Sequence, residues 1–162
     1  MKFIIKKGTH YSNETVFKLK NFFNTNNTLQ YQVVFDDSCV YELPKEDQGD
    51  INKLFGFSIG FNHHKNSARF GWSYQDGKIN LHAYIYDNGV RKSKLIDKLN
   101  FNSSYLLTLT DLGEEWKFSV ENGSNITELK MSKLHDFEWG YKLWPYFGGN
   151  NPAPHDITID LI

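Results

Sequence analysis

Side chains that can bind a polar ligand or move a proton are concentrated between Asn66 and Arg91. They are a guanidinium, an imidazole and two phenols: Arg69, His82, Tyr84 and Tyr86. Aromatic rings offer flat apolar surfaces, and guanidinium and imidazole groups form directed hydrogen bonds. A sugar-binding site needs both, because sugars present apolar C–H patches flanked by hydroxyl groups. We therefore expect this set to bind a ligand, with carbohydrate as the leading candidate.

The hairpin that would position these side chains is defined by its turn. Asp76-Gly77 is a dipeptide that closes two-residue hairpins, because both positions can adopt φ > 0. A turn there places apolar residues of both strands on one face, so register and hydrophobic pattern agree. The other face then pairs Ser73 with Asn80, Gly71 with His82, Arg69 with Tyr84, and Ser67 with Tyr86. Such a face indicates a binding site; the alternative is a cross-strand ladder that only stabilises the sheet.

Two further residues complete the predicted ligand-binding set. Asn62 follows the alternating stretch LFGFSIGF, whose residues Phe55, Phe57, Ile59 and Phe61 are predicted to point inward. Tyr146 lies in WPYFGGNNPAPHDITIDL, where Gly148 and Gly149 permit a tight turn and two prolines stiffen the chain that follows. This loop either lines the ligand site or is a crossover that lets the C-terminal strand pair beside the first strand.

Metal and cofactor sites are not indicated by the sequence. His63 and His64 are adjacent, so in a strand they would face opposite sides and make a poor metal pair. Other candidate ligands lack the EF-hand spacing and are expected in solvated turns: Asp47, Asp50, Asp111, Glu114 and Glu115. The motifs GxSxG, GxxxxGK[ST] and GxGxxG do not occur. We expect no cofactor and no resident metal, and the sequence leaves calcium binding open.

The composition favours strands over helices. Aromatic residues make up 16% of the 162 residues, while alanine, the best helix former, occurs only at Ala68, Ala83 and Ala153. Further strand-like stretches are FIIK, LQYQVVF, SCVYEL, SYLLTLT, WKFSVE and HDITIDLI. Residues 15–23 are compatible with either a helix or a strand. We expect one domain, residues 1–162, folded as an all-β, antiparallel two-sheet β-sandwich of the jelly-roll type with around ten strands.

Charge and targeting signals narrow the possible partners. The chain has 18 basic and 19 acidic residues, so no net field attracts nucleic acid or an anionic membrane. The apolar run in MKFIIKKGTH is too short for a signal peptide or a membrane span. Cys39 is the lone cysteine and cannot form an internal disulfide. We expect a soluble protein without a signal peptide, a glycan as partner, and neither nucleic acid nor membrane binding.

The succession of strands and the final YFGG…HDITIDL stretch resemble the concanavalin A-like jelly-roll superfamily of lectins, laminin-G-type modules and polysaccharide-active enzymes. Polysaccharide lyases of the alginate-lyase type carry an Arg-containing strand, a Gln-Ile-His strand and a Tyr-Phe-Lys-Ala-Gly strand. SARFGW, NLH and YFGG occur here in that order. The resemblance implies that Arg69 and Asn80 neutralise a uronate carboxylate, with His82 and Tyr146 as base and acid. The first motif lacks its second Arg and its Glu, and Gly148-Gly149 replaces Lys-Ala.

Three functional hypotheses follow. The leading one is a non-catalytic carbohydrate-recognition module that uses the aromatic, Arg and His face. The alternative is a phage or viral structural protein, such as a capsid decoration or fibre head. Such a protein needs no export signal, and a composition rich in Asn, Lys and Ile suits an AT-rich phage genome. This hypothesis predicts a homo-oligomer or virion assembly. The third is a lyase-like enzyme, which requires His82 and Tyr146 to converge on one sugar ring.

Overall fold

The computed structural model describes residues 1–13, 27–134 and 139–162. These residues form eleven strands and one short 3-10 helix, η2 (Asp37–Cys39). The strands are β1 (Lys2–Ile5), β2 (Thr28–Phe35), β3 (Asn52–Ile59), β4 (Ser67–Gln75), β5 (Lys78–Asp87), β6 (Val90–Leu99), β7 (Ser104–Asp111), β8 (Glu115–Asn122), β9 (Asn125–Ser132), β10 (Gly140–Leu143) and β11 (Ile157–Leu161). The undecided stretch 15–23 lies outside the described residues.

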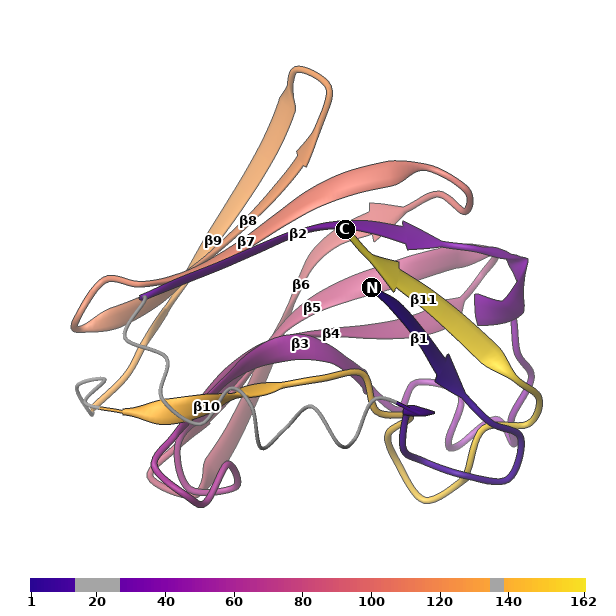
Figure 1. The fold of residues 1–162 in the computed structure, drawn as a ribbon, viewed down its shortest axis with the longest axis horizontal. Coiled ribbons are helices and arrows are strands. Elements are labelled where there is room, and N and C mark those ends of the chain that lie inside the picture. The colour runs from indigo at the N-terminus through magenta and orange to yellow at the C-terminus, as the bar shows by residue number, and fades with distance from the viewer. Residues whose placement is uncertain (14–26, 135–138) are drawn as a thin grey trace.

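Two antiparallel sheets form the layers of a sandwich (Figure 1). One has the order β1-β11-β2-β7-β8-β9 and the other the order β10-β3-β4-β5-β6. Aromatic rings fill the space between the layers: Phe70 packs edge-on against Phe118, and Phe57 stacks on Trp116. All four side chains are fully buried, as the alternating strands predict. The predicted all-β two-sheet sandwich is confirmed.

The β4–β5 hairpin forms in the predicted register. Asp76 and Gly77 occupy its turn with φ of 52° and 73°, the conformation that this dipeptide favours. Trp72 lies opposite Leu81 on the buried face, and Arg69 lies opposite Tyr84 on the other face. The turn Asn88-Gly89 also adopts positive φ and leads into β6.

Two local predictions are wrong. SCVYEL does not form a strand: residues 37–39 make the helix η2, whose N-cap Asp36 accepts a hydrogen bond from the Ser38 amide. Phe61 does not point inward and is 71% exposed. Its alternation is broken because β3 ends at Ile59 and Gly60 adopts a φ of 67°.

The C-terminal strand β11 lies between β1 and β2, so the preceding loop is the crossover that one interpretation expected. Two strands escaped prediction, β9 and β10. β10 matters for function because it pairs with the edge of β3 and leads directly into the Trp144–Tyr146 segment. In the described part of the chain, no helix is long and apolar enough to cross a membrane.

Candidate functional site

A pocket of about 350 Å³ lies on the outer face of the five-stranded sheet, opposite the face that packs into the core. Four of the six predicted ligand-binding residues line it: Arg69, Tyr84, Tyr86 and Tyr146. The structure therefore brings together the hairpin face and the C-terminal loop, which are far apart in the sequence. Asn62 and His82 are not among the lining residues.

The floor of the pocket is set by strand register. Arg69 on β4 is paired with Tyr84 on β5, and Tyr86 on β5 is paired with Arg91 on β6. Alternate residues of a strand face the same side, so Tyr84 and Tyr86 lie next to each other with ring centroids 5.8 Å apart. Three neighbouring strands thus present two phenols flanked by two guanidinium groups.

Lys53 and Tyr146 form a wall of the pocket. The two residues exchange both backbone hydrogen bonds, Lys53 N to Tyr146 O at 2.8 Å and Tyr146 N to Lys53 O at 3.0 Å. This bridge fastens the loop after β10 to the edge of β3. Glycine makes the close approach feasible, because a Cβ on Gly148 would lie 2.2 Å from the Ile51 carbonyl oxygen. The loop is therefore both the crossover and a wall of the pocket.

Arg69 is the deepest charged group of the pocket and is only 6% exposed. Its Nε atom has no hydrogen-bond partner, and within the described ranges its guanidinium forms no ion pair. Burial lowers the pKa of Arg69, although the surrounding tyrosines oppose the shift. The guanidinium carbon lies 5.9 Å from the centroid of the Tyr84 ring, within range of a cation–π contact.

Lys53 adds a second positive charge beside the same ring. Its Nζ donates a hydrogen bond to the Ile51 carbonyl oxygen at 2.5 Å and lies 4.7 Å from the Tyr84 centroid. Burial, followed by the charges of Arg69 and Arg91, lowers the pKa of Lys53 to about 8, against a smaller opposing effect of Asp50. Burial and the Tyr86 hydroxyl raise the pKa of Tyr84 to about 12, so this phenol stays neutral at physiological pH.

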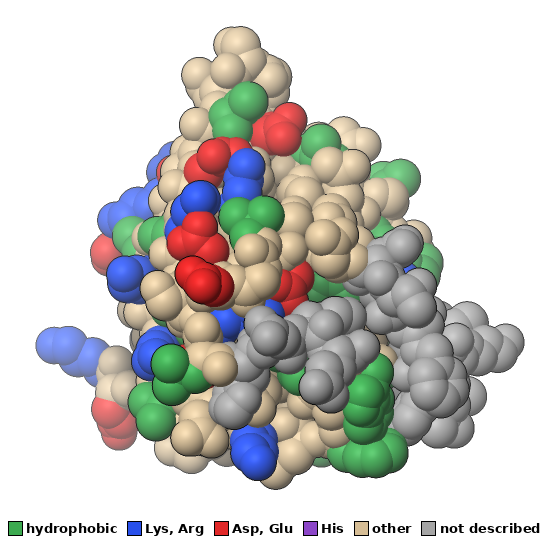
Figure 2. Space-filling model, turned by 90° about the vertical axis from the view of Figure 1, so that its left-hand side faces the viewer, with side chains coloured by type: hydrophobic (Ala, Val, Ile, Leu, Met, Phe, Trp, Pro, Cys, Tyr) green, Lys and Arg blue, Asp and Glu red, His purple; other side chains and the backbone are tan. Residues whose placement is uncertain are grey.

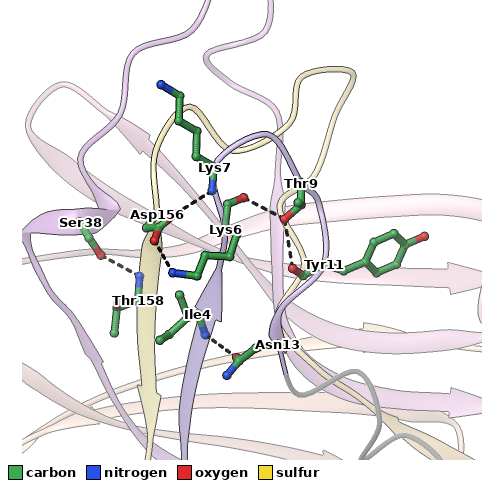
Figure 3. A network of polar contacts seen from close by, with 9 residues as sticks. All are labelled: Ile4, Lys6, Lys7, Thr9, Tyr11, Asn13, Ser38, Asp156 and Thr158. Carbon is green, nitrogen blue, oxygen red and sulfur yellow. Dashed lines mark hydrogen bonds and ion pairs between the residues drawn. The ribbon is translucent and has the colours of Figure 1, made fainter.

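The N-terminal segment closes one side of the pocket through Tyr11 and Ser12. A polar network holds this segment against β1 and β11 (Figure 3). In it, Lys6 pairs with Asp156 at 2.6 Å, and the Thr9 hydroxyl donates to the Lys6 carbonyl oxygen at 2.8 Å. The ring of Tyr11 points away from the network and meets the Tyr146 ring edge-on at 5.1 Å.

Asn62 has a turn-forming role. Its side-chain oxygen accepts a hydrogen bond from the His64 backbone amide at 3.0 Å, and its carbonyl accepts from the Lys65 amide. This turn carries His63 and His64 to the rim of the pocket, where the His64 ring packs against Tyr86. The histidine pair, which the sequence indicated only as a poor metal pair, lines the pocket, and Asn62 forms the turn that positions it.

His82 is separated from the pocket. The space beside Gly71, which faces His82 across the strand pair, is filled by Ile51, whose Cγ2 would lie 2.4 Å from a Cβ at Gly71. His82 instead shares a hydrogen bond with the Ser73 hydroxyl at 3.3 Å, and burial lowers its pKa. Asn80 donates to Gln75. The base and acid implied by the lyase resemblance, His82 and Tyr146, therefore do not share the pocket.

Metal ligands are not gathered at this site. Within residues 1–13, 27–134 and 139–162, no group of three His, Cys, Asp or Glu side chains is placed to hold an ion. Asp111, one candidate for calcium, instead accepts hydrogen bonds from the Gly113 amide and the Lys133 ammonium group.

Sequence reasoning missed the pocket residues Lys53, Arg91, Tyr11 and Ser12. Arg91 could have been found, because the Asn88-Gly89 turn sets it opposite Tyr86 by the same register logic. Lys53 could not, because a β-bulge between Lys53 and Gly56 changes the face to which the alternation assigns it.

No family model matches this sequence, and no curated protein matches it. The fold does match solved structures. An alginate lyase from Klebsiella pneumoniae superposes with a TM-score of 0.63 at 9% identity, covering 83% of this chain and 56% of that one. A functionally unknown protein from Saccharomyces cerevisiae gives 0.55 at 13% identity, covering 98% and 83%. The enzymatically active domain of bacteriophage CBA120 tailspike protein 2 gives 0.53 at 10% identity, covering 86% and 23%. The chain thus spans about half the length of the alginate lyase, and these similarities concern the fold.

Proposed function

We propose that this protein is a non-catalytic recognition domain that binds carbohydrate in the pocket between the β4–β5 face and the loop after β10. The observation that carries the proposal is the lining of the pocket, in which the tyrosines Tyr84, Tyr86 and Tyr146 surround fixed hydrogen-bond donors. This combination suits the alternating apolar and hydroxyl-bearing surfaces of a sugar ring. The fold shared with an alginate lyase supports the same class of ligand.

A binding role is favoured over catalysis by the placement of His82. A general base must reach the proton it removes, directly or through one water. His82 does not line the pocket and shares a hydrogen bond with Ser73, while Tyr146 stacks on His10 at 5.4 Å. If the protein were nevertheless a lyase, unsaturated product would accumulate from alginate and be detected by its ultraviolet absorbance.

The test is a glycan array followed by titration of intrinsic fluorescence, because Trp144 lines the pocket and would report binding. We expect Tyr86→Ala and Tyr146→Ala to weaken binding about tenfold or more, and Tyr86→Phe to keep most of it, since stacking requires the ring. Gln30→Ala, on an exposed part of the other sheet, is the control. Failure to bind any glycan, or binding unaffected by both alanine variants, would contradict the proposal.

A virion role is the second candidate, supported by the fold shared with a phage tailspike domain. It is compatible with glycan binding, and it predicts a homo-oligomer. Light scattering or native mass spectrometry tests it: a symmetric oligomer supports this role, and a strict monomer at high concentration counts against it.

A further inference from the structure

We propose that the ligand is an acidic carbohydrate, whose carboxylate or sulfate group is bound by Lys53, Arg69 and Arg91. This inference rests on the proposed function and adds the chemical class of the sugar. Three strands of the five-stranded sheet, β3, β4 and β6, each bring one of these cations to the same pocket.

The pocket is positive because its cations are not balanced. Of the described residues that line it, none is an aspartate or a glutamate. Asp50 lies in an adjoining hollow that shares Lys53 and Arg91 with the pocket, so one carboxylate opposes three cations in the two cavities together. The chain as a whole has a net charge of −1, so this excess is local. A local excess of one sign selects ligands of the opposite sign.

Arg69 is the strongest single indication that this pocket binds an anion. A buried ion is costly unless a counter-ion and hydrogen bonds replace its hydration shell. Lys133, also buried, meets this requirement, because its Nζ lies 2.6 Å from Asp111. Arg69 is buried equally well but has neither a carboxylate partner in the described ranges nor a hydrogen bond at Nε. A ligand carboxylate or sulfate in the pocket would supply the missing partner, and the planar guanidinium is suited to bind it with two hydrogen bonds.

The β8–β9 hairpin offers a contrast, because its lysines are paired with carboxylates. Figure 2 shows basic and acidic side chains interspersed on one face of the molecule. On the β8–β9 hairpin, Lys117 pairs with Glu128 at 2.6 Å and Lys130 with Glu115 at 2.7 Å. Among the described residues, Lys53, Arg69 and Arg91 form no such ion pair.

The other two cations extend the anion site toward the solvent. Lys53 uses one N–H for the Ile51 carbonyl, which leaves two donors for a ligand. Arg91 is exposed at the rim beside Tyr86 and can attract an anion from solution. The acidic group would thus sit between Lys53 and Arg69, with the sugar ring against Tyr84, Tyr86 or Tyr146.

Single-stranded nucleic acid also combines negative charge with stacking groups. It is bound by long basic grooves that follow the backbone over several nucleotides. A pocket of about 350 Å³ in a chain without net positive charge fits one or two sugar units better. An oligonucleotide is therefore included in the test as a competing ligand.

The experiment is calorimetric titration with four probes of similar length: oligouronates from alginate, sulfated heparin oligosaccharides, neutral malto-oligosaccharides and a single-stranded oligonucleotide. We expect one acidic sugar class to bind at least tenfold more tightly than the neutral one, and the two acidic probes show whether carboxylate or sulfate is preferred. Lys53→Gln and Arg91→Gln should each weaken this binding about tenfold, since hydrogen bonds to charged groups are the stronger ones.

The matched control is Lys94→Gln, which removes the same charge from an exposed position on β6 outside the pocket lining. It should leave binding within about twofold, because surface charges act weakly at a distance. Equal affinity for neutral and acidic sugars would overturn this inference and leave the proposed function standing. Preference for the oligonucleotide would overturn both. An equal loss of affinity in Lys94→Gln and Lys53→Gln would mean that nonspecific attraction to positive charge, and not the pocket, holds the acidic sugar.

Discussion

The Arg69 guanidinium carbon lies 5.9 Å from the centroid of the Tyr84 ring, its direct cross-strand partner. Lys53 Nζ lies 4.7 Å from the same centroid. Two like charges thus lie close to one aromatic ring, which partly offsets their desolvation but cannot neutralise them. We therefore expect Arg69 to lower the stability of the fold and to raise its affinity for an anion, and both effects can be measured.

Replacing Arg69 with methionine should stabilise the fold while weakening acidic-ligand binding. Methionine fills a similar volume without a charge to bury, so we expect the free energy of unfolding to rise by about 1–2 kcal/mol. Denaturation by urea measures this change, and calorimetry measures the loss of binding. A variant that is less stable than the wild type would show that Arg69 contributes to the fold.

Binding of an acidic ligand should weaken as the pH rises above about 8. Lys53, with its pKa lowered to about 8, is charged below that pH and neutral above it. A bound anion favours the charged form and shifts this loss to somewhat higher pH. The other charged groups near Lys53 are Arg69, Arg91 and Asp50. Tyr84, with its pKa raised to about 12, stays neutral in this range.

Affinities measured between about pH 7 and about pH 10 test this dependence, with Lys53→Met as the control. The variant should bind more weakly at pH 7 and show a flatter profile above pH 8. Parallel profiles for both proteins would assign the titration to another group.

The buried pair of Lys133 and Asp111 should matter far more for stability than an exposed pair. Lys133→Met leaves the Asp111 carboxylate buried without its partner, which costs about 3–5 kcal/mol. Lys130→Met breaks the exposed pair with Glu115 and should change the free energy of unfolding far less, because solvent screens exposed pairs. Thermal or chemical unfolding compares the two. Similar losses would mean that burial of Lys133 does not govern its contribution.

Gly56 should not tolerate a side chain. A Cβ at this position would lie 2.0 Å from the Ala68 carbonyl oxygen and 2.4 Å from the Arg69 Cβ, so β3 and β4 would have to separate. We expect Gly56→Ala to cost about 1–3 kcal/mol and to weaken ligand binding by displacing Arg69. Gly49→Ala is the control, because its Cβ would meet only the flexible end of Gln75. Equal stability of the two variants would contradict this close packing of β3 against β4.

The sequence predicted the floor of the site because that part depends on local rules. The Asp76-Gly77 turn and the apolar alternation around it determine the register, and the register alone places Arg69 opposite Tyr84. The walls depend on contacts between distant segments. Tyr146 reaches the site through a bridge to Lys53, 93 positions away by residue number. Ile51 fills the space beside Gly71, and His82 does not line the pocket.

Lys53 shows why pattern reading fails at an irregularity. Strict alternation with Phe55 and Phe57 assigns Lys53 to the core face. The bulge between Lys53 and Gly56 instead delivers its ammonium group to the outer face, beside Tyr84. Phe61 fails for a similar reason, since Gly60 ends the alternation one residue earlier.

Mapping the bound ligand by NMR tests the central claim most directly. The ¹⁵N-labelled protein would be titrated with oligouronates, or with whichever glycan binds most tightly on the array. Our account predicts that the largest amide shifts occur at the pocket, at Lys53, Arg69, Tyr84, Tyr86 and Tyr146. Shifts centred instead on the outer face of the six-stranded sheet, around Gln30 and Thr108, would contradict it.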